Sequence, residues 1–208
     1  MDDIFDAILN QLDEKGFAVV DDFISQQSVE TLLRYGHDAL SNCAFKQAGI
    51  GRQLGFHTND AIRKDHVHWL TQQTIQQECP QLYNHINSII EQLNRICFSG
   101  INQCEFHLAN YEPGAYYKRH LDQFKNNGDR RFTIIVYLNN QWQTQDGGQL
   151  VVYGDKGTQT ILPQAGRLVF FPSDKLEHEV LPANRARWSF TGWLKTVKVP
   201  QSCCSTNY

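Results

Sequence analysis

Apolar side chains in the first hundred residues recur every three or four positions, which is the spacing of an amphipathic helix. The pattern predicts a helix that begins near Ile4 and stops at Gly16, a second that follows Ser28, and a third that opens at Pro80. A short apolar run at 17–20 predicts a strand between the first two helices. This region is therefore expected to be mainly helical.

From about residue 101 the hydrophobic period changes from 3.6 to two, which indicates β-strands. Turn-forming sequences such as Glu112-Pro113-Gly114 separate the apolar runs. About eight short strands with such turns are typical of a double-stranded β-helix, or jelly roll. We therefore predict an α+β fold, mainly β, with the N-terminal helices packed on one sheet. The expected strands are 103–111, 116–122, 131–139, 148–153, 158–162, 167–171, 177–181 and 187–195.

The length of the chain, 208 residues, fits a single domain with a substantial core. We expect helical support and a substrate loop in 1–100, the jelly-roll core in 101–195 and a polar tail in 196–208. The formal charge of −3 gives no overall attraction to nucleic acid or to a membrane surface. No apolar run reaches the roughly 18 residues of a membrane span. The acidic start of the chain is unlike a signal peptide, so a cytoplasmic protein is expected.

The six cysteines contain no Cys-x-x-Cys pair. A zinc knuckle is therefore not expected, and the reduced thiols of a cytosolic protein are favoured. Cys97 and Cys104 lie among apolar residues and are predicted to be small core side chains. The pattern assigns no role to Cys203 and Cys204, which are adjacent in the tail.

His120-Leu121-Asp122 is the strongest local signal for a metal site. Residues i and i+2 of a strand point to the same face, so both side chains can reach one ion. His178 lies in a later predicted strand and offers a third ligand. Two imidazoles and one carboxylate on one face of an octahedron are typical of non-haem Fe(II) oxygenases. The alternative is a surface His and Asp at the end of a strand.

A second signal lies nine residues after His178, where Arg187 begins a predicted strand. Arg187, Ser189, Thr191 and Trp193 share one face of that strand, and an inward arginine requires an anion. Its guanidinium suits a ligand carboxylate, with Arg185 as the next candidate for that role.

The phenol of Tyr137 points the same way as Thr133 and Ile135 in another strand, and it can bind the same carboxylate. The alternatives are an exposed strand arginine at Arg187 and an ordinary core tyrosine at Tyr137.

These residues together resemble the 2-oxoglutarate and Fe(II)-dependent dioxygenases. Within them the chain is most similar to the prolyl 4-hydroxylases, especially the hypoxia-inducible-factor prolyl hydroxylases and their bacterial relatives. The resemblance runs in family order from about residue 60 to 195. It is carried by Ile62-Arg63-Lys64-Asp65 with Trp69 following, Asn110-Tyr111-Glu112-Pro113-Gly114, Tyr117-Lys118-Arg119-His120-Leu121-Asp122, Val136-Tyr137-Leu138-Asn139, Gly147-Gly148-Gln149-Leu150, His178-Glu179-Val180 and Arg187. The chain resembles the catalytic domain without the longer N-terminal extension of some animal members.

The resemblance implies a protein prolyl 4-hydroxylase that uses O2, 2-oxoglutarate and Fe(II) and releases succinate and CO2. Ascorbate is implied as a stimulating reductant, and elongation factor Tu as a candidate proline-containing substrate. The implied catalytic residues are the iron ligands His120, Asp122 and His178, together with Arg187. The implied cofactor-binding residues are Tyr111, Tyr137, Arg187, Thr191 and Trp193.

A polar stretch with three glycines, 47–59, predicts a long mobile loop. The resemblance implies that the whole segment from Gln47 to Trp69 closes over a peptide substrate. Arg63 and Asp65 are expected to form a salt bridge within this loop, and direct contact with substrate is their alternative role.

Two other functions remain open at this point. The first is a 2-oxoglutarate oxygenase that acts on another amino acid or on a small molecule. The second is a non-catalytic metal-binding jelly roll that acts as a sensor. The presence of a carboxylate ligand with Arg187 and Tyr137 in phase favours an enzyme over the sensor.

Overall fold

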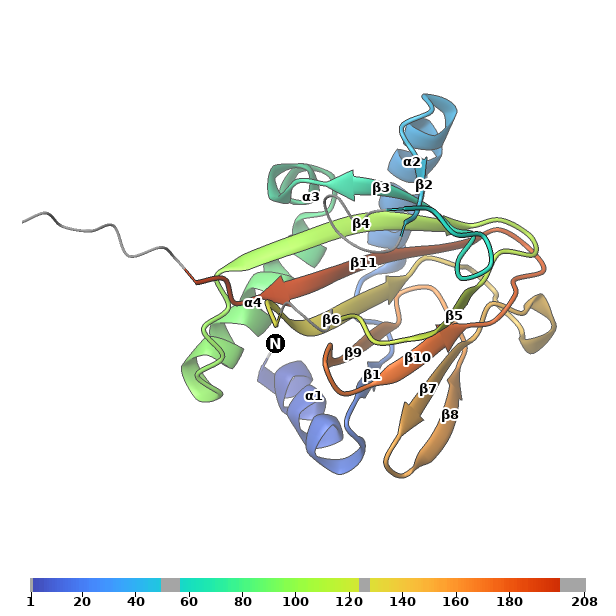
Figure 1. Cartoon of the computed structure of the whole chain (residues 1–208). Helices are drawn as coiled ribbons and strands as arrows, with labels where there is room; N and C mark the ends of the chain where they lie inside the picture. Colours follow the sequence, from blue (N-terminus) through green and yellow to red (C-terminus); the bar gives the residue numbers. More distant parts are fainter. Residues whose placement is uncertain (1, 50–56, 124–127, 199–208) are drawn as a thin grey trace, which may run out of the picture.

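The computed structural model describes residues 2–49, 57–123 and 128–198, which form two antiparallel sheets and four α-helices (Figure 1). The helices are α1 (Asp2–Lys15), α2 (Gln26–Ser41), α3 (Gln72–Glu78) and α4 (Pro80–Ile96). The seven-stranded sheet has the order β1 (Ala18–Val20), β9 (Leu168–Pro172), β6 (Arg130–Tyr137), β11 (Arg187–Lys195), β4 (Gln103–Tyr111), β3 (His66–Leu70) and β2 (Lys46–Gln47). The four-stranded sheet has the order β5 (Tyr117–His120), β10 (Glu177–Val180), β7 (Leu150–Gly154) and β8 (Gly157–Ile161).

Local capping sets the ends of the helices. α1 ends before Gly16, whose φ of +81° favours glycine and whose N–H donates to the carbonyl of Leu12 at 2.9 Å. α2 begins after Ser25, whose hydroxyl oxygen accepts a hydrogen bond from the backbone N–H of Ser28 at 3.2 Å. The expected start after Ser28 is therefore too late, because Ser25 is the N-cap. Pro80 opens α4 as predicted.

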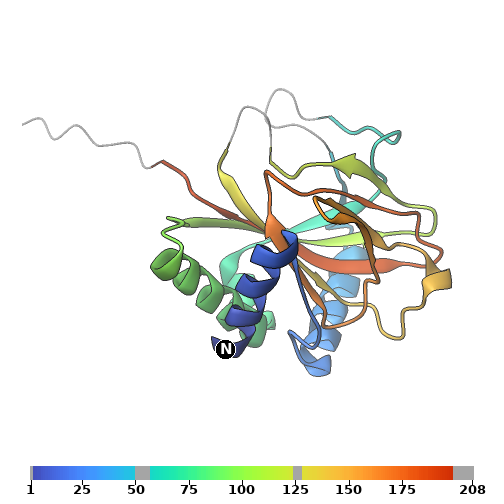
Figure 2. The same cartoon turned by 90° about the horizontal axis from the view of Figure 1, so that it is seen from below.

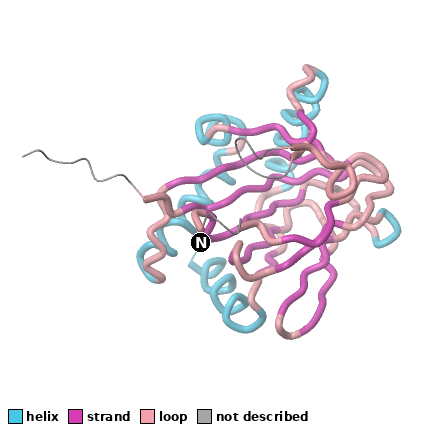
Figure 3. The backbone as a smooth tube through the Cα atoms, in the orientation of Figure 1, coloured by secondary structure: helices cyan, strands magenta, loops and turns pink. Residues whose placement is uncertain are grey.

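The helices pack on one side of the larger sheet, and the smaller sheet lies on its other side (Figure 2). The tube view separates the outer helices from the strands in the same way (Figure 3). One apolar core joins α1, α2 and α4 to the larger sheet, and a second core fills the space between the two sheets. The predicted jelly roll with helices on one sheet is confirmed.

Strand β11 lies between β6 and β4 at the middle of the larger sheet. Its bounds coincide with the predicted strand at 187–195. Trp188 and Phe190 belong to the core beneath the helices, whereas Arg187 and Ser189 line a cavity on the opposite face. The alternating pattern therefore places the predicted site residues between the sheets, away from the helices.

The segment from Gln47 to Trp69 is not one continuous loop, which corrects the sequence prediction. Residues 66–70 form β3, which pairs with β4 and extends the larger sheet. Trp69 is therefore held in a strand. Residues 50–56, the central part of the predicted loop, lie outside the described residues. The short helix α3 was also not predicted.

The cysteine prediction is partly wrong. Cys97 is exposed and Cys104 is half-buried, whereas Cys79 is a core residue. Burial raises the pKa of Cys104 to about 11, so its thiol stays protonated at neutral pH. The four cysteines in the described part of the chain are free thiols, and Cys203 and Cys204 lie outside it. Among the described residues, no helix combines the length and the apolar character needed to span a membrane.

Candidate metal and cosubstrate site

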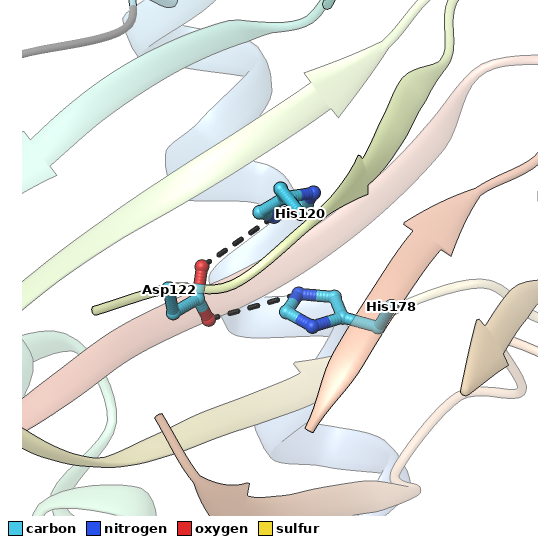
Figure 4. A group of neighbouring side chains, drawn as sticks. All are labelled: His120, Asp122 and His178. Carbon is cyan, nitrogen blue, oxygen red and sulfur yellow. Dashed lines mark ion pairs between the residues drawn. The ribbon is translucent and has the colours of Figure 1, made fainter. Parts of the chain in front are cut away.

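His120, Asp122 and His178 come together at the edge of the four-stranded sheet (Figure 4). His120 ends β5, Asp122 follows two residues later, and His178 lies in β10 directly opposite His120. One potential ligand atom from each residue lies within 4.8 Å of the others. Residues 58 positions apart in the sequence therefore form one cluster because β5 and β10 pair in antiparallel register.

Hydrogen bonds orient both imidazole rings toward the carboxylate. Nδ1 of His120 lies 2.6 Å from the carbonyl oxygen of Lys118, and Nδ1 of His178 lies 3.1 Å from that of Leu176. Since a carbonyl only accepts, each Nδ1 carries a proton, and this leaves each Nε2 facing the carboxylate. The two Nε2 atoms lie 3.5 and 3.7 Å from the oxygens of Asp122, a gap that one bound ion would fill.

The protonation states also suit a metal cation. Burial alone would raise the pKa of Asp122, but His178, His120 and the hydroxyl of Thr133 hold it well below its usual range. Thr133 donates to Asp122 Oδ2 at 2.8 Å. Burial, with the nearby charge of His120, lowers the pKa of His178 to about 4, so this ring is neutral at pH 7. One anionic oxygen and an imidazole nitrogen from each histidine form a donor set that fits Fe(II).

The cluster opens into a cavity of about 830 Å³ between the two sheets. Arg187 lines this cavity and is 2% exposed, and among the described residues no carboxylate pairs with it. Its Nε donates to the carbonyl of Gly148 at 2.8 Å. A buried guanidinium without a counter-ion is costly, so this end of the cavity is suited to an anionic ligand.

Tyr137 lies next to Arg187 but does not itself line the cavity. It is fully buried, and the guanidinium carbon of Arg187 lies 5.0 Å from the centre of its ring. Burial raises the pKa of Tyr137 despite the opposing charge of Arg187, so the phenol keeps its proton. Its hydroxyl is among the buried polar atoms that have no hydrogen-bond partner in the described chain. A protonated, buried hydroxyl without a partner can donate a hydrogen bond to a ligand carboxylate beside Arg187.

The other cofactor-binding candidates lie on the walls of the same cavity. Tyr111, Thr191 and Trp193 all line it, and the guanidinium carbon of Arg187 lies 4.8 Å from the ring centre of Tyr111. Arg185, the alternative anion site, is 43% exposed, pairs with Asp146 and does not line the cavity. The structure therefore brings the predicted set together and leaves Arg185 outside it.

Gly148 provides the space that Arg187 occupies. Its φ is +65°, and a Cβ built on it would lie 2.9 Å from Cδ of Arg187. We expect Gly148→Ala to displace the guanidinium and raise the Kd for 2-oxoglutarate about tenfold, since misplacement by ~1 Å can cost up to roughly 100-fold. Gly16→Ala is the control, because Gly16 has φ +81° with nothing within 4 Å of its Cβ position. Both substitutions should cost about 1–2 kcal/mol of stability, but only the first should change binding in a titration.

The predicted substrate-loop residues lie near the mouth of the cavity. Arg63 and Asp65 form the expected salt bridge, with Nε to Oδ1 at 2.7 Å and Nη2 to Oδ2 at 2.5 Å. Asp65 is completely buried, whereas Trp69 is 55% exposed. Arg63 and Trp69 line the cavity and Asp65 does not.

Sequence reasoning missed one buried residue of the cavity wall, His107. It is 3% exposed and lies between the rings of Trp69 and Trp193, with ring centres 5.0 and 5.3 Å away. Burial, with help from the charge of Arg63, lowers the pKa of His107 to about 3, so its ring is neutral. Its position on the inward face of β4 was available from the alternation Glu105, His107, Ala109, but no motif distinguished it from a structural histidine.

Comparison with known proteins agrees with this geometry. The family model described as the 2OG-Fe(II) oxygenase superfamily matches residues 106–195, which include the three clustered residues and Arg187. A crystal structure of a prolyl-4-hydroxylase from Pseudomonas putida has 31% sequence identity and a TM-score of 0.83, and the match covers 93% of this chain and 100% of that chain. The chain belongs to the 2OG-Fe(II) oxygenase superfamily. The family implies Fe(II), 2-oxoglutarate and O2.

Within that superfamily several relatives of this chain are named prolyl hydroxylases. A Trichoplax adhaerens prolyl hydroxylase, solved with a hypoxia inducible factor oxygen degradation domain peptide fragment, has 26% identity and a TM-score of 0.84. That match covers 93% of this chain and 90% of the other. The hypoxia-inducible factor prolyl hydroxylase of Caenorhabditis elegans is 31% identical over 203 residues, which cover 91% of this chain but 28% of the nematode protein. The chain thus spans under a third of that relative.

Proposed function

We propose that this chain is a protein prolyl 4-hydroxylase, with residues 1–208 forming a single oxygenase domain. The overall reaction converts a prolyl residue, 2-oxoglutarate and O2 into hydroxyprolyl, succinate and CO2. The observation that carries the proposal is the buried guanidinium of Arg187, which pairs with no carboxylate of the described residues and lies in the same cavity as His120, Asp122 and His178. An iron site alone would not require that cation.

In this proposal His120, Asp122 and His178 would hold Fe(II) through one carboxylate oxygen and two imidazole nitrogens. The bound metal supplies the redox chemistry that activates O2. The hydrogen bonds from Nδ1 of each histidine fix the orientation of the rings, and the hydroxyl of Thr133 does the same for the carboxylate. The protein residues therefore preorganise the donor set before any ligand arrives.

Arg187 and Tyr137 bind the distal carboxylate of 2-oxoglutarate in this proposal. The guanidinium contributes charge and parallel N–H donors, and the neutral phenol adds an O–H donor. Tyr111 and Thr191 contact the cosubstrate nearer the metal, and Trp193 shields it from water. The tight burial of Arg187 makes this interaction stronger than the same pair would be in water.

We propose a proline-containing protein as the substrate, with elongation factor Tu as the first candidate and a cytoplasmic location. The relatives named prolyl hydroxylase support the substrate class. Ascorbate is proposed as a stimulating reductant. The test measures succinate release with and without proline-containing peptides from elongation factor Tu and from hypoxia inducible factor, and locates the added oxygen by mass spectrometry. Peptide-stimulated succinate release without oxygen on proline would favour an oxygenase for another amino acid.

Trp69 is proposed to contact the peptide at the mouth of the cavity. A large apolar side chain that is 55% exposed beside the site is well placed to pack against substrate. We expect Trp69→Ala to raise the KM for a peptide substrate about tenfold, while the Kd for 2-oxoglutarate changes by less than about twofold. Phe98→Ala is the control, because Phe98 is 88% exposed and does not line the cavity. Equal KM values for both variants would remove Trp69 from the peptide site.

A further inference from the structure

The metal-binding strand β5 is an edge strand, and its free side is covered by residues 62–64. β5 pairs with β10 on one side only. On the other side, Lys118 N–H donates to the carbonyl of Ile62 at 2.9 Å, and Lys64 N–H donates to that of Tyr116 at 3.0 Å. These two bonds place Arg63 opposite Tyr117 in an isolated antiparallel bridge. The segment before β3 is therefore attached directly to the strand that ends in His120.

Side chains in the same region contact one another in series, from Arg63 through Tyr117 to His120 of the metal cluster. The guanidinium carbon of Arg63 lies 4.1 Å from the ring centre of Tyr117. The ring of Tyr117 in turn stacks on that of His120, with 3.5 Å between centres and an angle of 14° between planes. The two-pronged salt bridge to the buried Asp65 fixes the plane of the Arg63 guanidinium. Each residue in this series of contacts restricts the orientation of the next one.

His120 is the ligand that most needs such support. Its side chain is 14% exposed, against 4% for His178 and 9% for Asp122. It also ends a four-residue strand, so the backbone beyond it is not held in the sheet. The hydrogen bond from Nδ1 to Lys118 restrains one edge of the ring, and the stack on Tyr117 restrains one face.

We propose that Asp65, Arg63 and Tyr117 are positioning residues that hold the His120 ring in the orientation needed for metal binding. The proposal rests on the iron site proposed above. It assigns these residues a role in the metal site, in addition to the salt bridge within the loop that the sequence suggested. It also couples residues 62–65, near the mouth of the cavity, to the metal ligand.

The decisive variants preserve the fold while removing the stack. Arg63→Lys keeps a positive charge beside the buried Asp65 but loses the planar fork and its stacking on Tyr117. Tyr117→Leu removes the ring, whereas Tyr117→Phe keeps the ring and removes only the hydroxyl. Arg119→Lys is the matched control: Arg119 also stacks on a tyrosine, Tyr153, at 3.9 Å and pairs with a carboxylate, but on the exposed outer surface.

The measurements are Fe(II) affinity under anaerobic conditions, the visible absorption of the Fe(II)–2-oxoglutarate complex, and thermal unfolding of the metal-free protein. Arg63→Lys and Tyr117→Leu are expected to weaken Fe(II) binding about tenfold and to shift the absorption. Arg63→Lys disturbs a buried ion pair and should cost more metal-free stability than Arg119→Lys, but each variant should remain folded at the temperature of the binding measurement. Tyr117→Phe should bind Fe(II) like the wild type.

Unchanged Fe(II) binding in Arg63→Lys and Tyr117→Leu would overturn the proposal. So would a loss in Tyr117→Phe equal to that in Tyr117→Leu, or a loss of binding explained by unfolding of the metal-free variant at that temperature. These outcomes differ from a failure of the proposed iron site. In that case the wild type itself would not bind Fe(II), or would bind it no better than Asp122→Ala.

Discussion

Asp122→Ala is expected to reduce Fe(II) affinity more than about 100-fold and to abolish hydroxylation of a peptide substrate. Removing an outer partner of a metal ligand typically costs ~10–100-fold, and loss of the only anionic ligand in the cluster should cost more. Asp122→Asn keeps the shape and can still accept from Thr133, so its expected loss of Fe(II) would identify charge as the cause. Calorimetric titration and peptide mass spectrometry measure the two effects.

Asp155→Ala is the control for this substitution. Asp155 is exposed in the turn between β7 and β8, outside the residues that line the cavity. Its loss should leave both metal binding and hydroxylation at wild-type values. Full hydroxylation by Asp122→Ala would remove the His120, Asp122 and His178 cluster from the reaction.

Two of the strands that carry this site, β10 and β11, were predictable because their sequences alternate between two faces. β11 is the best example: Trp188 and Phe190 alternate with Arg187, Ser189 and Thr191 over the first five residues of the strand. That alternation placed Arg187 on the face opposite Trp188 and Phe190, and the structure shows that this face lines the cavity between the sheets. His120 ends β5 and Asp122 lies two residues beyond it, and both side chains reach the same cluster.

β3 could not be predicted in this way. Its sequence, His66-Val67-His68-Trp69-Leu70, alternates polar and apolar residues over four positions only, and its partner β4 lies about forty residues further along the chain. Pairing with an existing buried strand supplies the stability that the local sequence lacks. The polar composition before β3 then made the whole segment resemble a loop.

The contacts that orient the candidate metal ligands could not be predicted from the local sequence either. Thr133 donates to Asp122 only because β6 passes beneath the cluster. Arg63 stacks on Tyr117 only because residues 62–64 cover an edge strand. A threonine or a tyrosine in a strand carries no sequence signal for such a role. Motifs therefore singled out the candidate ligands, whereas the residues that contact and orient them depend on tertiary pairing.

Arg187→Ala is expected to raise the 2-oxoglutarate concentration needed for half-maximal turnover by more than tenfold. Loss of a buried guanidinium from its carboxylate partner typically costs about 2–5 kcal/mol, and each ~1.4 kcal/mol is tenfold in affinity. Arg187→Lys should retain part of the charge interaction but lose the parallel donors. Its affinity for 2-oxoglutarate should therefore lie between that of the wild type and that of Arg187→Ala. Fe(II) binding without cosubstrate should change little, because Arg187 is not one of the clustered metal-binding residues.

Arg185→Ala is the matched control, since Arg185 lies two residues earlier and stacks on Trp142 at 4.1 Å outside the cavity. Its 2-oxoglutarate requirement should equal that of the wild type. An unchanged requirement in Arg187→Ala, together with a raised one in Arg185→Ala, would move the anion site to the outer surface. That result would also leave the cost of burying Arg187 unexplained. A buried guanidinium loses its hydration, and a bound anion is the partner expected to offset that loss.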